Sequence, residues 1–210
     1  MGVALVLATR NPAKAAQLRE LLAGLDVELS DGTSFPDPPD VDEEGGSHLA
    51  IAIGKAVEWS RSLGALAVAS DGGLSIPALG DGWSSLITRR GTGEDVPDEE
   101  RARRLLRRMR DLEGDRRACW WTEAVAVARS GELVGAWEAN GLEGYIADDF
   151  VPPEGGTNGF WVSGLWITRD GTRRWALTAE DAARLGDPWM SLREPLRGLL
   201  TSMDRMHRMA

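Results

Sequence analysis

Polar residues that could hold a phosphorylated ligand follow the first apolar run of the chain. Thr9, Asn11 and Lys14 lie where a strand should give way to a helix. The free N–H groups and the dipole at a helix start favour an anion, and an ammonium group adds positive charge. This spacing indicates a phosphate site, although a capped helix without a ligand shows the same pattern.

Carboxylates that could hold a divalent cation occur in two later segments. Asp40, Asp42, Glu43 and Glu44 share one acidic stretch, and Asp71 follows a second apolar run. Mg²⁺ takes one or two carboxylates together with phosphate oxygens of its substrate. Combined with a phosphate site, these residues predict a Mg²⁺ site, whereas an acidic stretch alone is usually solvated surface.

Lysine is rare in this chain. Its 24 basic residues are 22 arginines and two lysines, Lys14 and Lys55. An ammonium is a compact point charge that suits a cluster of phosphates without the fork geometry of arginine. The two lysines therefore indicate positions where an ammonium is needed, unless they survive by chance. Lys55 and Arg193 could add charge to a triphosphate site, where catalysis is largely positioning and charge neutralisation.

The remaining reactive side chains predict no site of their own. His48 and His207 lie far apart without cysteines at zinc-ligand spacing, and His48 is expected to cap a helix or to face solvent. Cys119 stands in an apolar strand pattern, which favours a buried and inert thiol. Trp161 and Trp166 fit either core positions or stacking on a base.

A strand followed by a helix should position Lys14. The apolar run from Val3 to Thr9 predicts the strand, and Asn11 as N-cap with Pro12 after it predicts the start of the helix. The apolar face of this helix is expected to consist of leucines at helical spacing, namely Leu18, Leu21, Leu22 and Leu25.

A second helix and strand should position Lys55 and Asp71. After an irregular loop over 31–46, a helix is expected over 47–62. Its core stripe is assigned to Leu49, Ile53, Ala56 and Val57. On this register Lys55 points away from the core. The run 65–70 predicts a strand that ends at Asp71, before Gly72 and Gly73, and ligands gather at such strand ends.

The rest of the chain alternates helical and strand patterns. We expect a solvated helix over 97–112, a long hairpin that turns at Ser130-Gly131, a glycine-rich loop over 155–160, a second hairpin at Asp170-Gly171, and a last helix over 187–206. Without repeats or a linker, the sequence predicts a single α/β domain over residues 1–210 with an extended antiparallel portion.

Composition excludes several classes of protein. With 33 acidic against 24 basic residues, the net charge of -9 argues against binding to nucleic acid, so any nucleotide partner should be a small molecule. No apolar stretch approaches the length of a membrane span, and Val6 breaks the myristoylation pattern. A single cysteine and an N-terminus without a basic region before its apolar run favour a cytoplasmic location.

Several segments resemble a known family in the family's own order. ATRNPAKAAQLRELL, at 8–22, resembles the Ser/Thr-Gly-Asn-x-x-Lys signature of the inosine/xanthosine triphosphate pyrophosphatase family. DEEGGSHLAIAIGKA resembles the segment in which a glutamate precedes a helix carrying Glu-Asn-Ala-x-x-Lys-Ala. ALAVASDGGLSIPALG resembles the Asp-Asp-Ser-Gly-Leu block, and EGGTNGF and MSLREPLRGLL resemble the glycine-rich and Ser-His-Arg blocks.

The resemblance implies a fold, a reaction and roles for residues. Members are elongated α/β homodimers, with a mixed sheet flanked by helices, that hydrolyse non-canonical purine triphosphates with Mg²⁺ to monophosphate and pyrophosphate. By this resemblance Glu43 would hold Mg²⁺, Asp71 would share the metal and orient or deprotonate the attacking water, and Lys55 would be the third catalytic residue. The positions that would contact substrate are Thr9, Asn11, Lys14, Gly72, Phe160, Trp161, Ser163, Ser191 and Arg193.

The departures from the family pattern fall mainly on the side of the base. Arg10 replaces a glycine, Ser70 the first aspartate of the pair and Ile51 an asparagine. Val162-Ser163-Gly164 replaces Tyr-Asp-Pro, and Leu192 replaces the histidine of Ser-His-Arg. If a short insertion follows it, Ala182 replaces a lysine. The resemblance implies that these last positions face the base, so Leu192→His is expected to shift preference toward inosine triphosphate.

The sequence therefore predicts a Mg²⁺-dependent nucleotide pyrophosphohydrolase with altered base preference. Two alternatives stay open. One is an inactive nucleotide-binding protein, favoured by Ser70 and Leu192 and opposed by Glu43, Lys55 and Asp71. The other is an enzyme that releases one phosphate from a nucleoside di- or monophosphate.

Overall fold

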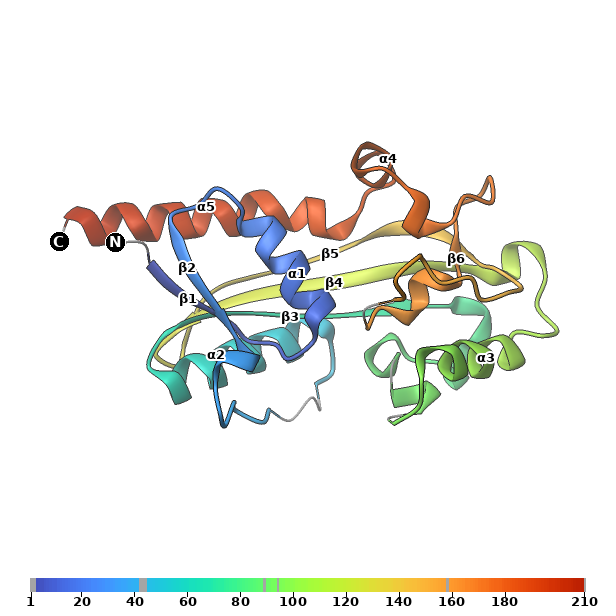
Figure 1. Cartoon of the computed structure of the whole chain (residues 1–210), viewed down its shortest axis with the longest axis horizontal. Coiled ribbons are helices and arrows are strands. Elements are labelled where there is room, and N and C mark those ends of the chain that lie inside the picture. Colours follow the sequence, from blue (N-terminus) through green and yellow to red (C-terminus); the bar gives the residue numbers. More distant parts are fainter. Residues whose placement is uncertain (1–2, 42–44, 89, 94, 158, 210) are drawn as a thin grey trace. The chain divides into compact units, whose positions relative to one another are not determined.

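The chain forms one mixed sheet with helices. The computed structural model describes residues 3–41, 45–88, 90–93, 95–157 and 159–209. Their strands and main helices are β1 (Val3–Leu7), α1 (Pro12–Leu22), β2 (Val27–Asp31), α2 (His48–Leu63), β3 (Leu66–Ser75), α3 (Asp98–Arg108), β4 (Ala118–Arg129), β5 (Glu132–Ile146), β6 (Trp166–Ile167), α4 (Ala179–Arg184) and α5 (Pro188–Met209). The strand order is β2-β1-β3-β4-β5-β6, as Figure 1 shows. The predicted α/β class is confirmed.

By their internal contacts the residues divide into two compact units. The first comprises 1–71, 123–139 and 188–210, and the second comprises 72–122 and 140–187. Strands β3, β4 and β5 contribute residues to both units. The assignment of residues 1–210 to a single domain stays a prediction.

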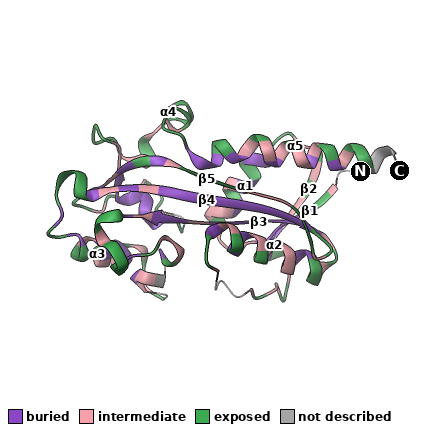
Figure 2. Ribbon diagram, turned by 180° about the vertical axis from the view of Figure 1, so that it is seen from behind, coloured by how far each residue is buried: buried purple, intermediate pink, exposed green. Residues whose placement is uncertain are grey.

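In the first unit, side-chain size differs between the two faces of the sheet. Leucines and valines of β1, β3 and β4 form one core cluster with α1 and α5. The alternate residues are mostly alanines, and they pack against Ala52, Ala56 and Trp59 of α2. Successive side chains of a strand point to opposite faces, so each strand contributes to both clusters, and Figure 2 shows how fully β4 is buried. The small alanines let α2 lie close to the sheet.

The start of α1 agrees with its prediction. The Asn11 side chain accepts hydrogen bonds from the backbone N–H groups of Ala13 and Lys14, and Pro12 is the first helical residue. Leu18, Leu21 and Leu22 are buried, whereas Leu25 lies beyond the helix. The cap and the leucine face therefore fix both the start of α1 and its rotation, which sets the direction of Lys14.

The predicted core stripe of α2 was wrong by part of a turn. The buried face of this helix consists of His48, Ile51, Ala52, Ala56, Trp59 and Ser60. Leu49, Ile53 and Val57 are only partly buried. Lys55 therefore lies on the face toward the sheet, not away from the core, and its side chain is 13% exposed. The error arose because the larger aliphatic residues were assigned to the core, whereas the alanines form the close contact.

Strand β3 is longer than its pattern indicated. It continues from Leu66 through Asp71 to Ser75, so Asp71 lies inside the strand and not at its end. Its parallel neighbour β1 pairs with it only up to Leu7 and Val68, and Ala8 then donates one further hydrogen bond to Val68. Strand β1 therefore ends before it reaches the level of Asp71. The short strand β2 was not anticipated, because its residues fell between two loop signals.

The predicted long hairpin is confirmed. Strands β4 and β5 are joined by Ser130 and Gly131, both with positive φ, as a tight two-residue hairpin turn requires. Cys119, near the start of β4, is buried in the core of the second unit. Burial raises the pKa of its thiol. This fits the expected inert cysteine.

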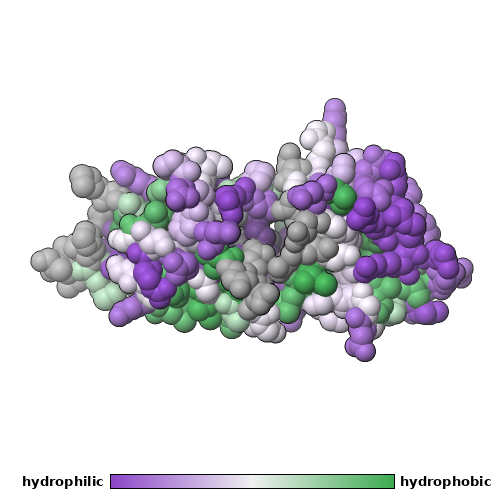
Figure 3. Space-filling view, turned by 90° about the horizontal axis from the view of Figure 1, so that it is seen from below, coloured by the Kyte–Doolittle hydropathy of each residue, from purple (hydrophilic) through white to green (hydrophobic). Residues whose placement is uncertain are grey.

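Helix α3 is the solvated helix that its charges predict. Arg103 pairs with Glu99 and Arg104 pairs with Glu100, each four residues apart. Figure 3 shows hydrophilic side chains gathered where α3 lies. Ala102 and Leu105 on the opposite face are fully buried.

The second predicted hairpin is reduced to a turn. Residues 161–164 form a short 3-10 helix, and β6 has two residues that pair antiparallel with β5. After the turn at Asp170-Gly171 a single bridge joins Ile167 to Arg173. The apolar residues of this segment are buried from a 3-10 helix and a very short strand, not from one face of a long strand. The apolar pattern was therefore mistaken for that of a hairpin.

The last helix corrects the expectation for Leu192. Leu192 on α5 is 2% exposed and lies in the first core cluster, so its side chain does not face a base. We expect Leu192→His to lower the free energy of unfolding by about 3 kcal/mol, because it places a polar ring in a packed apolar core. Urea denaturation measures this loss. Met190→His, on an exposed position of the same helix, should change stability by less than about 0.5 kcal/mol; equal stability of the two variants would contradict the core assignment.

None of the described helices is long and apolar enough to span a membrane.

Candidate active site

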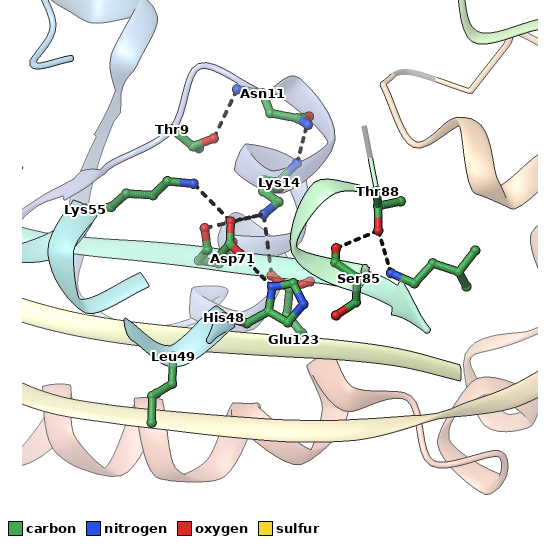
Figure 4. A network of polar contacts seen from close by, with 12 residues as sticks. Thr9, Asn11, Lys14, His48, Leu49, Lys55, Asp71, Ser85, Thr88 and Glu123 are labelled. Carbon is green, nitrogen blue, oxygen red and sulfur yellow. Dashed lines mark hydrogen bonds and ion pairs between the residues drawn. The ribbon is translucent and has the colours of Figure 1, made fainter. Parts of the chain in front are cut away.

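Asp71 is the centre of a cluster of cationic and polar side chains in the first unit. Its Oδ1 lies 3.1 Å from Lys55 Nζ and 3.9 Å from Lys14 Nζ, and its Oδ2 lies 2.6 Å from His48 Nδ1. Figure 4 shows these side chains converging on the carboxylate. Asp71 is 8% exposed, so the cluster forms around a largely buried carboxylate.

Three elements bring the cluster together. Asp71 is carried by β3, Lys14 by the first turn of α1, and both His48 and Lys55 by α2. Seven residues are close to two helical turns, so His48 and Lys55 project from the same face of α2. The alanines around them hold that face close enough to β3 for both side chains to reach the same carboxylate.

Lys14 has a second acidic neighbour. Its Nζ donates a hydrogen bond to the Ser70 carbonyl at 3.4 Å and lies 3.9 Å from Glu123 Oε1. Glu123 is 1% exposed, on β4. By strand alternation, the side chains of Ser70 and Glu123 face the α1 side of the sheet, whereas Asp71 faces α2. Lys14 therefore reaches carboxylates from both faces past the end of β1.

The turn before α1 is held by its own polar side chains. Thr9 Oγ1 accepts a hydrogen bond from the Asn11 backbone N–H at 3.0 Å. The Asn11 side chain caps the helix, as described above. Together these bonds fix the backbone at the helix start that was predicted to receive phosphate, beside Lys14.

The charges around Asp71 hold it in the ionised form. Burial by itself raises the pKa of this carboxyl, but the hydrogen bond from His48 and the charges of Lys14 and Lys55 outweigh it and lower the pKa from 3.8 to about 2. An ionised carboxylate has no proton to donate, so the Nδ1–H of His48 must be the donor of their bond. Nδ1 of the buried imidazole therefore carries a proton.

Because its pKa is lowered on folding, Asp71 stabilises the fold above the pKa of the unfolded chain and loses that contribution as pH falls toward 2. The contribution near neutral pH is about 2 kcal/mol. We expect the difference in unfolding free energy between the wild type and Asp71→Asn to be constant above about pH 5 and to shrink between about pH 4 and pH 2. Urea denaturation across this range measures it. A difference that already shrinks between pH 5 and pH 7 would show that Asp71 titrates elsewhere.

The oxygen donors of the cluster suit Mg²⁺ that is shared with a phosphate ligand. Within the described ranges, no group of three or more His, Cys, Asp or Glu side chains could hold a metal ion by itself. Mg²⁺ commonly takes one or two carboxylates and completes its shell with substrate oxygens and water. The carboxylate of Asp71 fits that requirement. Glu43, the other predicted ligand, lies outside the described residues, as do Asp42 and Glu44.

The remaining predicted residues are not all part of this cluster. On α5, Ser191 is exposed and Arg193 is half-buried, and neither belongs to the described contacts of Asp71. Asp40 is exposed and pairs with Arg10 at the surface. The structure therefore brings both lysines to Asp71, while the place of Arg193 in the site stays a prediction.

Four predicted substrate positions belong to the second unit. Gly72 follows Asp71 within β3. Phe160 is half-buried, with its ring edge-to-face against Trp121 and the Arg174 guanidinium 5.5 Å from its centroid. Trp161 is 3% exposed and lies in the second core cluster, as does Trp166. The rings of Trp161 and Trp166 therefore pack in the core, which was the alternative to stacking on a base. The Ser163 hydroxyl is also buried and donates to the Phe160 carbonyl.

Sequence reasoning missed two members of the cluster. His48 was expected to cap α2 or to face solvent, but Ser47 is the N-cap and His48 is 4% exposed. A polar residue seven positions before Lys55 is the signal that could have identified it. Glu123 was overlooked within a strand pattern. A single carboxylate among consecutive buried apolar residues was its signal, because a buried charge requires a partner.

Comparisons with known proteins identify the family of this chain. A model of the Ham1 family matches residues 5–172. A dITP/XTP pyrophosphatase of Geobacillus kaustophilus is 35% identical over 144 residues, which cover 69% of this chain and 70% of that protein. A dITP/XTP pyrophosphatase of Streptomyces avermitilis is 33% identical over 165 residues, covering 73% and 82%.

Solved structures share the fold. A HAM1 protein from Coxiella burnetii has a TM-score of 0.71 and 24% identity, covering 99% of this chain and 100% of that one. A nucleoside-triphosphatase / dITP/XTP pyrophosphatase from Mycobacterium abscessus has a TM-score of 0.66 and 30% identity, covering 90% and 96%. The family model spans most of the chain, and the motifs it covers include Lys14, Lys55 and Asp71. The chain therefore belongs to the Ham1 family.

Proposed function

We propose that this protein is a Mg²⁺-dependent nucleoside triphosphate pyrophosphohydrolase that acts on a non-canonical, modified or analogue nucleotide. The observation that carries the proposal is the convergence of the only two lysines of the sequence on one buried carboxylate, Asp71, beside a helix start. The names of its relatives, dITP/XTP pyrophosphatase, support the same reaction. Together they favour hydrolysis of a phosphoric anhydride.

The residues of the site have separable tasks in this reaction. The start of α1, with Thr9 and Asn11, would bind phosphate oxygens through backbone N–H groups. Lys14 and Lys55 would neutralise the triphosphate and hold it in one orientation. Asp71, with Glu43, would hold Mg²⁺, which when bound supplies further neutralisation of phosphate charge. Water attacks the α-phosphorus, and the bond between the α-phosphorus and the oxygen that bridges it to the β-phosphorus breaks. Monophosphate and pyrophosphate are the products.

The low pKa of Asp71 refines its role. A carboxylate whose pKa is about 2 has little affinity for a proton near neutral pH, so it is a weak general base. Its negative charge and fixed orientation are better suited to aligning the attacking water by accepting a hydrogen bond. We therefore assign Asp71 to holding the water and the metal rather than to removing a proton.

Altered base preference is part of the proposal. Leu192 lies in the core, and the hydroxyl of Ser163 already bonds to the Phe160 carbonyl. Leu192 has no polar group to offer a base, and the hydroxyl proton of Ser163 is already donated. Discrimination depends on polar groups matched to the base, so a site that lacks them should rank nucleotides differently from one that has them.

Phosphorus NMR tests the reaction. Purified protein is incubated with Mg²⁺ and a panel of canonical, deaminated and analogue nucleotides in water enriched in ¹⁸O. We expect monophosphate and pyrophosphate from at least one nucleotide, with ¹⁸O in the monophosphate, because attack occurs at the α-phosphorus. Inorganic phosphate as the product would instead support a phosphohydrolase of di- or monophosphates.

The rival function is nucleotide binding without turnover. Ser70 favours it, because its buried hydroxyl, which has no hydrogen-bond partner within the described part of the chain, stands where the family pattern has an aspartate. A panel without any product, combined with nucleotide-dependent quenching of tryptophan fluorescence, would replace the enzyme by this binding protein.

The assembly and location of the protein are also proposals. A homodimer follows from the family resemblance, and size-exclusion chromatography with light scattering measures it. A cytoplasmic location is consistent with a small nucleotide substrate and with a single cysteine.

A further inference from the structure

His48 is buried, and its bond to Asp71 is the shortest contact of the cluster. The ring is 4% exposed, and its Nδ1 lies 2.6 Å from Asp71 Oδ2. Lys55 Nζ lies 3.1 Å from the other oxygen, Oδ1. Both donors project from one face of α2, about two turns apart, as Figure 4 shows at the carboxylate. Helix α2 therefore supplies the hydrogen-bond donors to both oxygens of Asp71.

We propose that His48 is a positioning residue, which fixes the orientation of the Asp71 carboxylate for the hydrolysis proposed above. The inference rests on that proposed function. The Nδ1–H of His48 binds Oδ2, so Oδ1 is the oxygen that faces Lys55 and Lys14. The carboxylate then aligns water and metal from one fixed oxygen.

The arrangement explains why a histidine is buried at the start of α2. A carboxylate held by a single donor can rotate about its Cβ–Cγ bond, whereas donors on both oxygens fix its plane. Groups that orient a catalytic or metal-binding side chain typically contribute about 10- to 100-fold to activity. Ser47 already caps α2 by accepting a hydrogen bond from the Ala50 N–H, so capping does not account for His48.

Three substitutions separate the hydrogen bond from the volume of the ring. His48→Leu keeps an apolar side chain of similar size and removes the donor. His48→Asn places an amide N–H close to the position of Nδ1, and His48→Gln places it close to Nε2. We expect kcat to fall about 10- to 100-fold in His48→Leu and His48→Gln, and to stay within about tenfold of the wild type in His48→Asn. KM should change by less than about threefold in all three.

A matched control accounts for lost stability. Trp59→Phe alters another buried residue on the same face of α2, whose ring packs edge-to-face against Phe35. It should lower the melting temperature while kcat stays within about twofold of the wild type. Equal loss of kcat in this variant and in His48→Leu would show that His48 acts only by holding α2 in place, which would overturn the proposal.

Proton–nitrogen NMR on ¹⁵N-histidine protein observes the bond without turnover. The sequence has only two histidines, so His207→Gln assigns both signals. We expect a slowly exchanging, downfield Nδ1–H signal from His48 that is lost or moved upfield in Asp71→Asn. Absence of that signal, or its persistence unchanged in Asp71→Asn, overturns the proposal.

Failure of the proposed function is distinguishable from failure of this inference. If the wild type hydrolyses no nucleotide, the enzyme assignment fails. The same variants are then compared by binding of a non-hydrolysable triphosphate with Mg²⁺, followed by tryptophan fluorescence. Weaker binding by His48→Leu than by His48→Asn supports the positioning role, and equal binding contradicts it.

Discussion

Asp71→Asn should reduce kcat by about 10³-fold or more while the protein remains folded. Asparagine has nearly the same shape, but it removes the charge that opposes Lys14 and Lys55. Its amide can accept only through one atom, so either His48 or Lys55 faces a donor instead of an acceptor. A neutral amide is also a poor ligand for Mg²⁺. Single-turnover and steady-state rates measure the loss.

Asp31→Asn is the matched control for this variant. Asp31 is as buried as Asp71, both being 8% exposed, and it also pairs with a cation, Arg19. Asp31→Asn should lower stability but leave kcat within about threefold of the wild type. Circular dichroism verifies that both variants fold. Wild-type turnover by Asp71→Asn would remove Asp71 from the mechanism. If kcat fell equally in both variants, the loss in Asp71→Asn would reflect lower stability and not a catalytic role.

Lys14→Arg should lower kcat/KM by about 100-fold although the charge is conserved. Lys14 Nζ lies 3.4 Å from the Ser70 carbonyl and 3.9 Å from both Asp71 and Glu123, and its side chain is 21% exposed. A planar guanidinium is larger than an ammonium and directs its donors along a fork. In this confined space it cannot keep the three oxygens and also meet a phosphate in the orientation that an ammonium permits.

Arg10→Lys makes the opposite exchange close by. Arg10 pairs with Asp40, and their side chains are 61% and 96% exposed, so this surface ion pair contributes little. We expect kcat/KM of Arg10→Lys to stay within about twofold of the wild type. Steady-state kinetics on both variants tests the prediction. Full activity of Lys14→Arg would mean that the scarcity of lysine in the sequence carries no functional information.

Local chemistry sufficed to predict the elements that carry the site. Asn11 and Pro12 define the start of α1. Ser130 and Gly131 form the predicted hairpin turn, and both have positive φ. Lys14 and Lys55 could be selected as candidates because lysine is so rare, and Asp71 could be selected because it follows an apolar run. Their order along the chain also resembled the family's motifs.

The direction of a side chain around a helix was harder to predict. The large aliphatic residues of α2 suggested a stripe on Leu49, Ile53 and Val57, which would have turned Lys55 away from the sheet. In the structure the small residues Ala52 and Ala56 lie against the strands. Close packing favours the helix face whose small side chains fit against the sheet. The amphipathic pattern of α2 did not distinguish this face from the one that carries the larger aliphatic residues.

What the sequence by itself determined is the set of reactive residue types, the mixed fold and the local caps and turns, because these depend on neighbours along the chain. Only the tertiary structure decided that His48 and Glu123 belong with the lysines and that Leu192 does not face a base. Those outcomes depend on which strands and helices approach one another. A buried histidine or glutamate is stable only beside a partner that lies far away in the sequence, as Asp71 does for His48 and Lys14 for Glu123.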